Sequence, residues 1–196
     1  MKKIRQSSKF LLTLCLILSL TTPVMALDFH GWNLPDRMQA DDSTSLVLNG
    51  AGFRTKYFFD IYVGALYLMG KETNPEKIIL ADEYMGVRMH FTFRKVKHET
   101  LKEILKTGFS KATKGDTSSI QSQIDHLFAL LPQEFLKNDI VDLLYVPGRG
   151  IVTHINGKYA GECAGLDFKQ AVFAIWLGEE PVTEKLKAEM LGLETS

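Results

Sequence analysis

The sequence predicts an α+β fold with a mainly antiparallel sheet. Strand-like and helix-like segments occur in groups along the chain, without the strict alternation that is typical of a parallel sheet. The dipeptide Asn156-Gly157 is the strongest hairpin signal in the sequence and joins two expected strands, 151–155 and 159–163. A long apolar strand pattern also runs from Leu48 to Leu68. Grouped strands and tight hairpins both favour antiparallel pairing.

The first 26 residues have the features of a signal peptide. Four basic residues precede the apolar run Phe10 to Leu20, and Val24-Met25-Ala26 has the small-residue pattern of a signal-peptidase site. The apolar run has about 11 residues, whereas an ordinary bilayer span needs about 20. We therefore expect export, into the periplasm, with cleavage after Ala26. An uncleaved N-terminal anchor is the alternative.

Residues 27–196 are expected to form a single domain without a membrane span. These 170 residues suffice for a sizeable hydrophobic core, and no internal repeat or proline-rich linker interrupts them. Removal of the signal peptide takes away four basic residues and no acidic one, so the neutral chain becomes a domain of net charge −4. A nucleic-acid-binding protein would need a basic surface, so we expect no nucleic-acid partner.

Cys163 is the only cysteine of this domain. An exported domain with one thiol has no internal disulfide, and no surrounding His or Asn pattern supports a nucleophile. We expect Cys163 to be a small buried apolar residue. The histidines show no close metal-ligand spacing, and neither HExxH nor CxxC occurs. The sequence therefore predicts no metal and no cofactor.

The first half of the domain is expected to be rich in strands. Residues 27–45 are irregular and polar, with one possible short edge strand. Asn74 is expected to cap a short helix over 75–81. Residues 85–94 alternate apolar and polar side chains, which is typical of a strand with one buried and one wet face. Arg88 lies on that wet face, where we expect it to be solvated or to line a cleft.

The second half is expected to contain four helices. Segments 98–111 and 118–131 each place their apolar side chains on one stripe. Asp167 is expected to cap a helix that ends at residue 177, and a more polar helix follows over 181–191. A further strand covers 139–146 and leads into the hairpin around Asn156-Gly157.

Arg54 is the most informative single residue. The run from Tyr57 to Leu68 is dominated by aromatic and β-branched residues, and both of its alternating faces are largely apolar. A cation beside such a strand needs a partner, because an unpaired buried charge costs several kcal/mol. The partner is either a ligand carboxylate or a protein carboxylate such as Asp60.

Sequence blocks along the whole domain carry a family resemblance. The first is LVLNGAGFRTKYFFDIYVGALYL at 46–68, and later blocks are RMHF at 88–91, LLYVPGRG at 143–150, INGK at 155–158 and FAIWLGEEPV at 173–182. On these blocks the chain resembles the chalcone isomerase fold group, and most closely its exported bacterial chalcone-isomerase-like proteins. The resemblance implies an open-faced β-sandwich, in which helices pack on one face of a large antiparallel sheet and a ligand cleft lies between them.

The resemblance assigns Arg54 and Tyr62 to a ligand site. Plant isomerases of this group close a ring by attack of a phenolate oxygen on an enone; their arginine, which favours the oxyanion, falls on Arg54. Their threonine falls on Tyr62, and their helix-borne tyrosine and asparagine fall on Lys97 and Ile104. The non-catalytic branch, which binds fatty acids, grips a carboxylate with an arginine and a tyrosine from this segment. A guanidinium and a phenol together can donate three hydrogen bonds to one carboxylate.

Convergence of Arg54 and Tyr62 requires a bend in the chain. Eight residues of straight strand would span about 26 Å at ~3.3 Å per residue, which is beyond the reach of both side chains to one small anion. We therefore expect a hairpin near Thr55-Lys56. Gly50 and Gly52 are expected to mark a bulge or a close approach of another backbone.

The resemblance implies a non-catalytic binder of a fatty acid or a similar small amphipathic ligand with a carboxylate, held by Arg54 and Tyr62. The alternative is an intramolecular lyase or isomerase that acts on a chalcone-like phenolic or enone compound, with the same two residues as catalytic groups. A third interpretation is a structural or partner-binding envelope protein that keeps the fold without the cleft. Uptake of fatty acid and turnover of a chalcone distinguish the first two.

Overall fold

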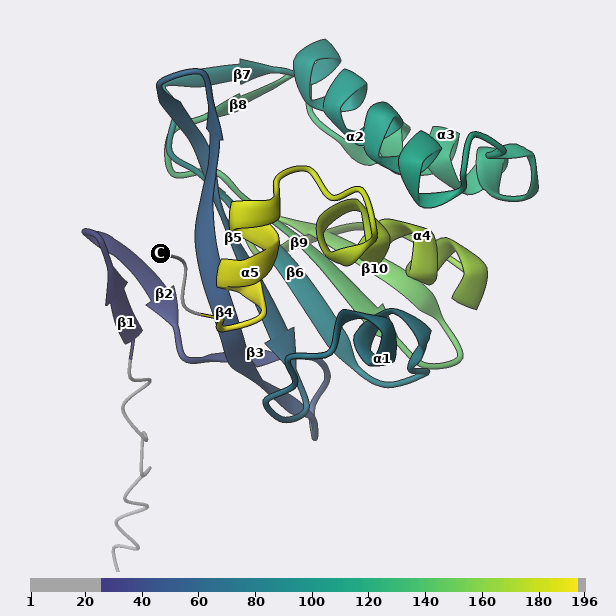
Figure 1. The fold of residues 1–196 in the computed structure, drawn as a ribbon, viewed down its shortest axis with the longest axis horizontal. Helices are drawn as coiled ribbons and strands as arrows, with labels where there is room; N and C mark the ends of the chain where they lie inside the picture. Colours follow the sequence, from purple (N-terminus) through teal and green to yellow (C-terminus); the bar gives the residue numbers. More distant parts are fainter. Residues whose placement is uncertain (1–25, 194–196) are drawn as a thin grey trace, which may run out of the picture.

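Residues 26–193, which the structure describes, contain a seven-stranded antiparallel sheet in a computed structural model (Figure 1). Its strands, in spatial order, are β11 (Lys158–Cys163), β10 (Gly150–Ile155), β9 (Ile140–Val146), β6 (Met85–Phe91), β5 (Phe59–Leu68), β4 (Ser45–Lys56) and β3 (Arg37–Gln39). Two further antiparallel pairs join β1 (Ala26–Phe29) to β2 (Trp32–Pro35) and β7 (Lys95–Lys97) to β8 (Glu134–Leu136). The predicted signal peptide lies outside the described residues except for Ala26.

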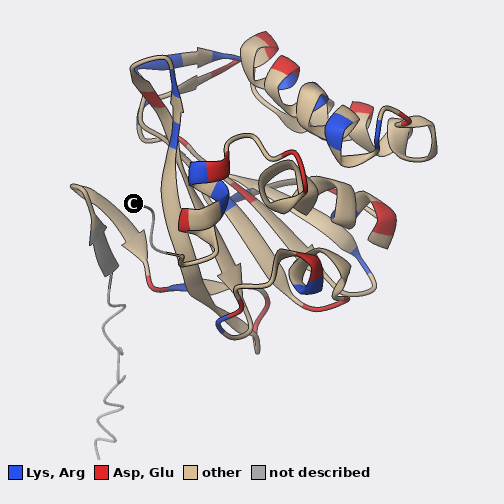
Figure 2. Cartoon of the chain, viewed as in Figure 1, with Lys and Arg blue, Asp and Glu red and all other residues tan. Residues whose placement is uncertain are grey.

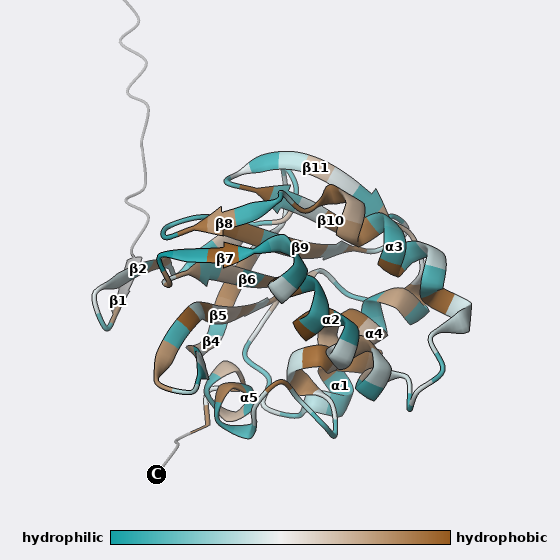
Figure 3. Ribbon diagram, turned by 90° about the horizontal axis from the view of Figure 1, so that it is seen from above, coloured by the Kyte–Doolittle hydropathy of each residue, from teal (hydrophilic) through white to brown (hydrophobic). Residues whose placement is uncertain are grey.

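Helices cover one face of the large sheet, which curls around them (Figure 3). They are α1 (Pro75–Leu80), α2 (His98–Ala112), α3 (Gln121–Leu130), α4 (Leu166–Leu177) and α5 (Glu184–Met190), and a 3₁₀ turn, Ser118–Ile120, precedes α3. The apolar side chains of the sheet and the helices form a continuous buried core between the two layers. This arrangement confirms the predicted α+β fold.

The strands β4 and β5 form the expected hairpin. Only Tyr57 and Phe58 separate them, and the register pairs Arg54 directly with Tyr62. Residues that are directly opposite each other on antiparallel strands place their side chains on the same face of the sheet. Arg54 and Tyr62 therefore both lie on the helix-covered face. The turn between β4 and β5 supplies the bend that their convergence requires.

Glycines in β4 allow α5 to lie directly on the strand backbone. A Cβ atom on Gly50 would clash with the carbonyl oxygen of Glu189 and lie 2.7 Å from that of Met190. The strand register also shifts between Leu48 and Gly50. A close backbone approach and a register shift are therefore both present at Gly50, whereas Gly52 faces the side chain of Glu189.

Asn49 anchors the C-terminal helix at this bulge. Its side chain is buried, and Nδ2 donates hydrogen bonds to the carbonyl oxygens of Glu72 (2.9 Å) and Met190 (3.0 Å). Its Oδ1 accepts a hydrogen bond from the Glu72 backbone N–H at 3.0 Å. The side-chain amide of Asn49 thus ties the end of α5 and the segment after β5 to β4. Asn49 holds the helix by hydrogen bonds, and Gly50 leaves room for the helix backbone.

The second face of the sheet is covered at residues 86–90, so the predicted wet face is wrong there, whereas Arg94 is exposed as expected. The ring of Trp32 in β2 lies 4.9 Å from the ring of His90, and Met38 of β3 packs over Gly86. Arg88 makes a two-pronged ion pair with Asp142, from Nε to Oδ1 at 2.7 Å and from Nη2 to Oδ2 at 2.8 Å. Arg88 is therefore a paired, mostly buried charge and does not line a cleft.

Of the two predicted helix caps, one is confirmed and one is wrong. Asn74 caps α1 as expected, because its Oδ1 accepts hydrogen bonds from the backbone of Glu76 and Lys77. Asp167 does not cap α4, because Gly165 occupies that position with φ +116°. The Asp167 carboxylate instead accepts a hydrogen bond from the Phe168 N–H within the first turn. The left-handed conformation of a glycine starts this helix.

A buried lysine joins α4 to α1. Lys169 is fully buried, and its Nζ donates to the carbonyl oxygens of Ile78 (2.9 Å), Ile79 (2.8 Å) and Ala81 (2.6 Å). These carbonyls lie at the C-terminal end of α1, where backbone acceptors lack partners within the helix. Burial lowers the pKa of Lys169 to about 8. The sequence carries no signal for this contact, because the partners of Lys169 are backbone carbonyls.

The prediction for Cys163 is confirmed. Cys163 is 3% exposed, and burial raises its pKa to about 11, which is the behaviour of a small apolar residue. Trp176 is buried within α4. Among the described helices, none is both long and apolar enough to cross a bilayer.

Substitution of Gly50 tests the contact between α5 and β4. We expect Gly50→Ala to lower the free energy of unfolding by about 1–3 kcal/mol, because the new methyl group forces the helix backbone away from the strand. Gly70→Ala is the matched control, since no atom lies within 4 Å of the position that its Cβ would take. Urea denaturation measures both variants. Equal stability of the two would contradict the close approach.

Candidate functional site

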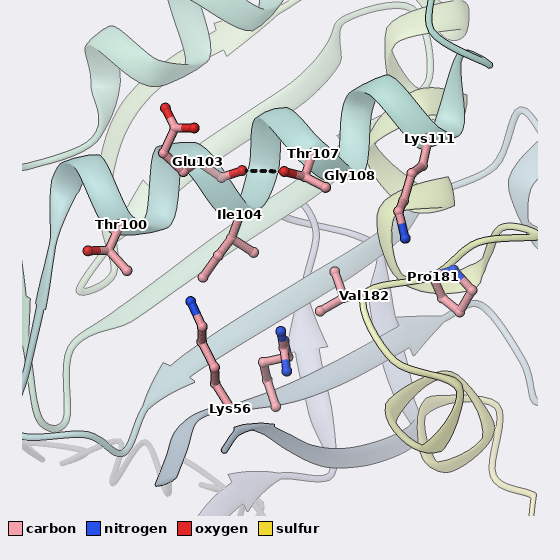
Figure 4. A pocket seen from close by; sticks show the side chains of 10 residues that line it. Lys56, Thr100, Glu103, Ile104, Thr107, Gly108, Lys111, Pro181 and Val182 are labelled. Atoms are coloured by element: carbon pink, nitrogen blue, oxygen red, sulfur yellow. Dashed lines mark hydrogen bonds between the residues drawn. The ribbon is translucent and has the colours of Figure 1, made fainter. Parts of the chain in front are cut away.

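Arg54 lies in the wall of a pocket between the sheet and α2. The pocket has a volume of about 310 Å³ and opens between the end of β4, one side of α2 and the segment before α5. Figure 4 shows Lys56 pointing toward Ile104 on α2, with Lys111 and Val182 at the other end. A volume near 300 Å³ is at the small end of the range for ligand pockets.

The guanidinium of Arg54 has no carboxylate partner among the described residues. Its Nη1 donates a hydrogen bond to the carbonyl oxygen of Thr55, whereas its Nε is buried and has no acceptor. Asp60, the expected protein partner, instead accepts a hydrogen bond from Thr55 Oγ1 at 2.6 Å. A buried donor without an acceptor is uncommon in proteins and calls for an explanation.

Tyr62 is held in the core beside Arg54. It is 1% exposed, and its hydroxyl oxygen accepts a hydrogen bond from Trp176 Nε1 at 3.1 Å. Burial raises the pKa of Tyr62 to about 12, although the hydrogen bond from Trp176 and the charge of Arg54 oppose that shift. The phenol therefore keeps its proton near neutral pH. That proton has no acceptor among the described residues.

The structure brings Arg54 and Tyr62 onto neighbouring strands, but only Arg54 lines the pocket. Tyr62 lies behind the pocket wall, between the sheet and Trp176. The two residues therefore do not form a single open surface in this structure. A ligand group that is to contact both has to enter deeper than the pocket floor.

The lining of the pocket favours an anion. Three cations contribute to it, Arg54, Lys56 and Lys111, against one carboxylate, Glu103. Glu103 lies on the outer surface of α2, where it is 3.8 Å from Lys106. A cleft lined mainly by one sign of charge concentrates ions of the opposite sign.

Helix α2 supplies two hydroxyl-bearing pocket residues beyond those predicted from the sequence, Thr100 and Thr107. Thr100 and Thr107 carry hydroxyl groups into the lining, and Thr107 Oγ1 already donates to the Glu103 carbonyl at 2.9 Å. Ile104, which the resemblance aligns with an asparagine of the isomerases, is half-buried and forms an apolar part of the pocket wall. The signal for these residues is their spacing: Thr100, Ile104 and Thr107 follow one another at intervals of four and three residues, so they share one helix face.

No group of three or more His, Cys, Asp or Glu side chains within residues 26–193 is arranged to hold a metal ion. The polar groups that the pocket offers to a ligand are mainly an arginine, two lysines and two threonine hydroxyls. These groups donate hydrogen bonds and carry positive charge, so they suit an acidic ligand.

Two comparisons with known proteins bear on this site. A family model described as chalcone isomerase-like matches residues 26–192. The fold is similar to the crystal structure of the fatty-acid binding protein AtFAP1 of Arabidopsis thaliana, with a TM-score of 0.66 and 18% sequence identity over 82% of this chain and 92% of that chain. Among curated protein sequences, none matches the chain.

Removal of the Tyr62 hydroxyl tests its structural role. We expect Tyr62→Phe to lower the free energy of unfolding by about 1–3 kcal/mol, because the buried N–H of Trp176 loses its acceptor. Tyr159→Phe is the matched control, since Tyr159 is 59% exposed. Urea denaturation of the ligand-free protein measures both. A Tyr62→Phe variant as stable as the control would show that this hydrogen bond contributes nothing.

Proposed function

The chain belongs to the chalcone isomerase-like family, and from this membership and the chemistry of Arg54 we propose that it is a non-catalytic binder of a fatty acid or a similar small amphipathic carboxylate. The similar plant structure is that of a fatty-acid binding protein, which supports the same class of ligand. We further propose that the protein is exported to the periplasm, as its basic and apolar N-terminal sequence predicts.

The observation that carries the proposal is the unpartnered edge of the Arg54 guanidinium. Arg88 of the same protein binds Asp142 through its Nε and Nη2 groups. In Arg54 the Nη1 group is taken by a backbone carbonyl, and the Nε group is buried without an acceptor. The edge that Arg88 uses for a carboxylate is therefore unused in Arg54. A ligand carboxylate would complete it with two parallel hydrogen bonds.

Tyr62 is the second residue of the proposed site. Its hydroxyl accepts from Trp176 and keeps a proton to donate, and its pKa of about 12 makes it a hydrogen-bond donor over the physiological pH range. Its position directly opposite Arg54, on the same face of the sheet, allows a carboxylate that enters beyond the pocket floor to contact both side chains. A ligand that stops in the outer pocket contacts Arg54 alone, so Tyr62 reports how deeply the carboxylate enters.

The remaining wall suits a short apolar segment. Ile104, Pro181 and Val182 line the pocket opposite the cations, and the volume is about 310 Å³. The ligand would thus place its carboxylate at Arg54 and its first methylene groups against these side chains. The apolar wall and the cationic wall together match an amphipathic acid better than a wholly polar anion.

Ring closure of a chalcone fits this site less well. The resemblance places Ile104 where the isomerases carry an asparagine, and the structure has Ile104 in the pocket wall, where it cannot hydrogen-bond a substrate. Tyr62, with a pKa of about 12, is far from the value near the working pH that favours acid–base catalysis. Both observations favour binding over turnover.

Fatty-acid titration of delipidated protein tests the proposal. We expect the parent protein to bind a medium-chain fatty acid and Arg54→Ala to bind it at least tenfold more weakly, because the carboxylate loses its charged partner. Arg37→Ala is the matched control, since Arg37 is exposed on the edge strand β3 away from the pocket. Calorimetric titration measures all three proteins.

Two results would contradict the proposal. The parent protein could fail to bind any fatty acid, or Arg37→Ala could weaken binding as much as Arg54→Ala. Turnover of a chalcone by the parent protein, lost in Arg54→Ala, would instead favour the isomerase alternative. The same protein preparations serve both assays.

A further inference from the structure

The tip of the β4–β5 hairpin exposes three consecutive aromatic side chains. Tyr57, Phe58 and Phe59 are 84%, 95% and 57% exposed. Phe59 touches Phe93, with 5.4 Å between the ring centroids, whereas Phe58 extends into solvent. A contiguous exposed apolar group of this kind is often an interaction site.

Neither local backbone preference nor core packing explains Tyr57 and Phe58. Tyr57 has φ +56°, a left-handed conformation that a two-residue hairpin normally fills with glycine, asparagine or aspartate. A bulky aromatic residue there is disfavoured by the backbone, and its ring gains no burial within the chain. A partner outside the described chain would explain why aromatic residues occupy the turn.

Basic residues surround this tip. We define the hairpin end as residues 55–60, 92–97 and 134–139. These segments are adjacent, because the Phe93 N–H donates to the Ile61 carbonyl and β7 pairs with β8. The hairpin end contains five basic and three acidic residues, whereas residues 27–196 as a whole have a net charge of −4. Figure 2 shows basic positions at the hairpin and along β7.

We propose that the hairpin end docks on the surface of an anionic lipid bilayer, with Tyr57, Phe58 and Phe59 inserted among the headgroups. Aromatic side chains are enriched at the boundary between hydrocarbon and water, where their rings lie at the level of the headgroups. Lys and Arg near an anionic bilayer add electrostatic attraction. Arg94 and Lys97, which are exposed in the hairpin end, would contact lipid phosphates while the aromatic rings insert.

A lipid surface fits this tip better than a folded protein partner does. A fully covered aromatic side chain buries about 200 Å², so the three exposed fractions amount to about 500 Å². A stable protein interface needs about 800 Å² on each partner, together with a complementary shape. A narrow hairpin tip offers little area beyond its rings, whereas a bilayer adapts to a protrusion of any shape.

Docking of the hairpin end would place the pocket near the membrane. Lys56, directly before the tip, and Arg54, two residues earlier, both line the pocket. A docked hairpin therefore brings the pocket close to the lipid surface, where a fatty acid or similar acid would be found. This consequence rests on the proposed function, whereas docking itself does not depend on what the pocket binds.

Vesicle flotation tests the docking. The protein is used from residue 26 onward, which contains every described helix and strand and excludes the apolar N-terminal run. We expect it to float with vesicles that contain phosphatidylglycerol and to float poorly with pure phosphatidylcholine. The double variant Tyr57→Ser/Phe58→Ser should bind at least tenfold more weakly, and Arg94→Glu several-fold more weakly. Tyr159→Ser, in the exposed β10–β11 hairpin, is the matched control and should bind like the parent.

Several results would overturn the proposal. The parent could fail to bind phosphatidylglycerol vesicles, the double variant could bind as well as the parent, or Tyr159→Ser could weaken binding equally. Self-association of the parent without vesicles, abolished in the double variant, would make the tip a protein interface instead.

Failure of docking is distinguishable from failure of ligand binding. The double variant should still take up a dissolved fatty acid, because its pocket is intact. Arg54→Ala should still float with vesicles. Vesicle binding by a parent protein that takes up no fatty acid would disprove the proposed function and leave the docking in place.

Discussion

The pairing of β4 with β5 is the constraint on which the other features depend. Its two-residue turn reverses the chain, so Arg54 and Tyr62 become direct neighbours on one face of the sheet instead of lying far apart along a single strand. The same reversal places the aromatic turn at the end of the molecule. Toward the other end of β4, the contact between Gly50 and α5 closes the layer of helices over the hairpin. Site, tip and helix packing thus follow from one hairpin.

Two arginines show how the chain treats buried positive charge. Arg88 lies between strands and is neutralised by Asp142, with both oxygens of the carboxylate engaged. Arg54 is half-buried in a pocket with other cations and has no such partner among the described residues. The cost of removing a charge from water is offset by a protein carboxylate in the first case. In the second case the opening of the pocket to water offsets part of that cost.

Local features of the fold could be predicted from the sequence. The helix starting after Asn74, the hairpin at Asn156-Gly157 and the bend before Tyr62 each follow from turn chemistry or from the reach of a strand, and all three are present. These features depend on residues that are close in sequence, or on a distance that the backbone geometry limits. The family resemblance added the overall arrangement of sheet and helices.

Long-range pairings could not be predicted in this way. Trp176 is 114 residues from Tyr62, and Asp142 is 54 residues from Arg88, so no spacing rule connects them. The alternating pattern of 85–94 also predicted a wet face, because alternation shows which residues are polar and cannot show that the hairpin of β1 and β2 covers them. Lys169 escaped notice for a similar reason: its partners are backbone carbonyls, which carry no sequence signal.

The proposed role of Arg54 is to hold a carboxylate from outside the chain. Native mass spectrometry of the purified protein tests it most directly, since it detects any acid that copurifies. The expected spectrum contains a species heavier than the chain by the mass of a carboxylic acid, and Arg54→Ala should lack that species while Arg37→Ala keeps it. A parent protein with the mass of the bare chain alone, even after incubation with fatty acids, would contradict the claim.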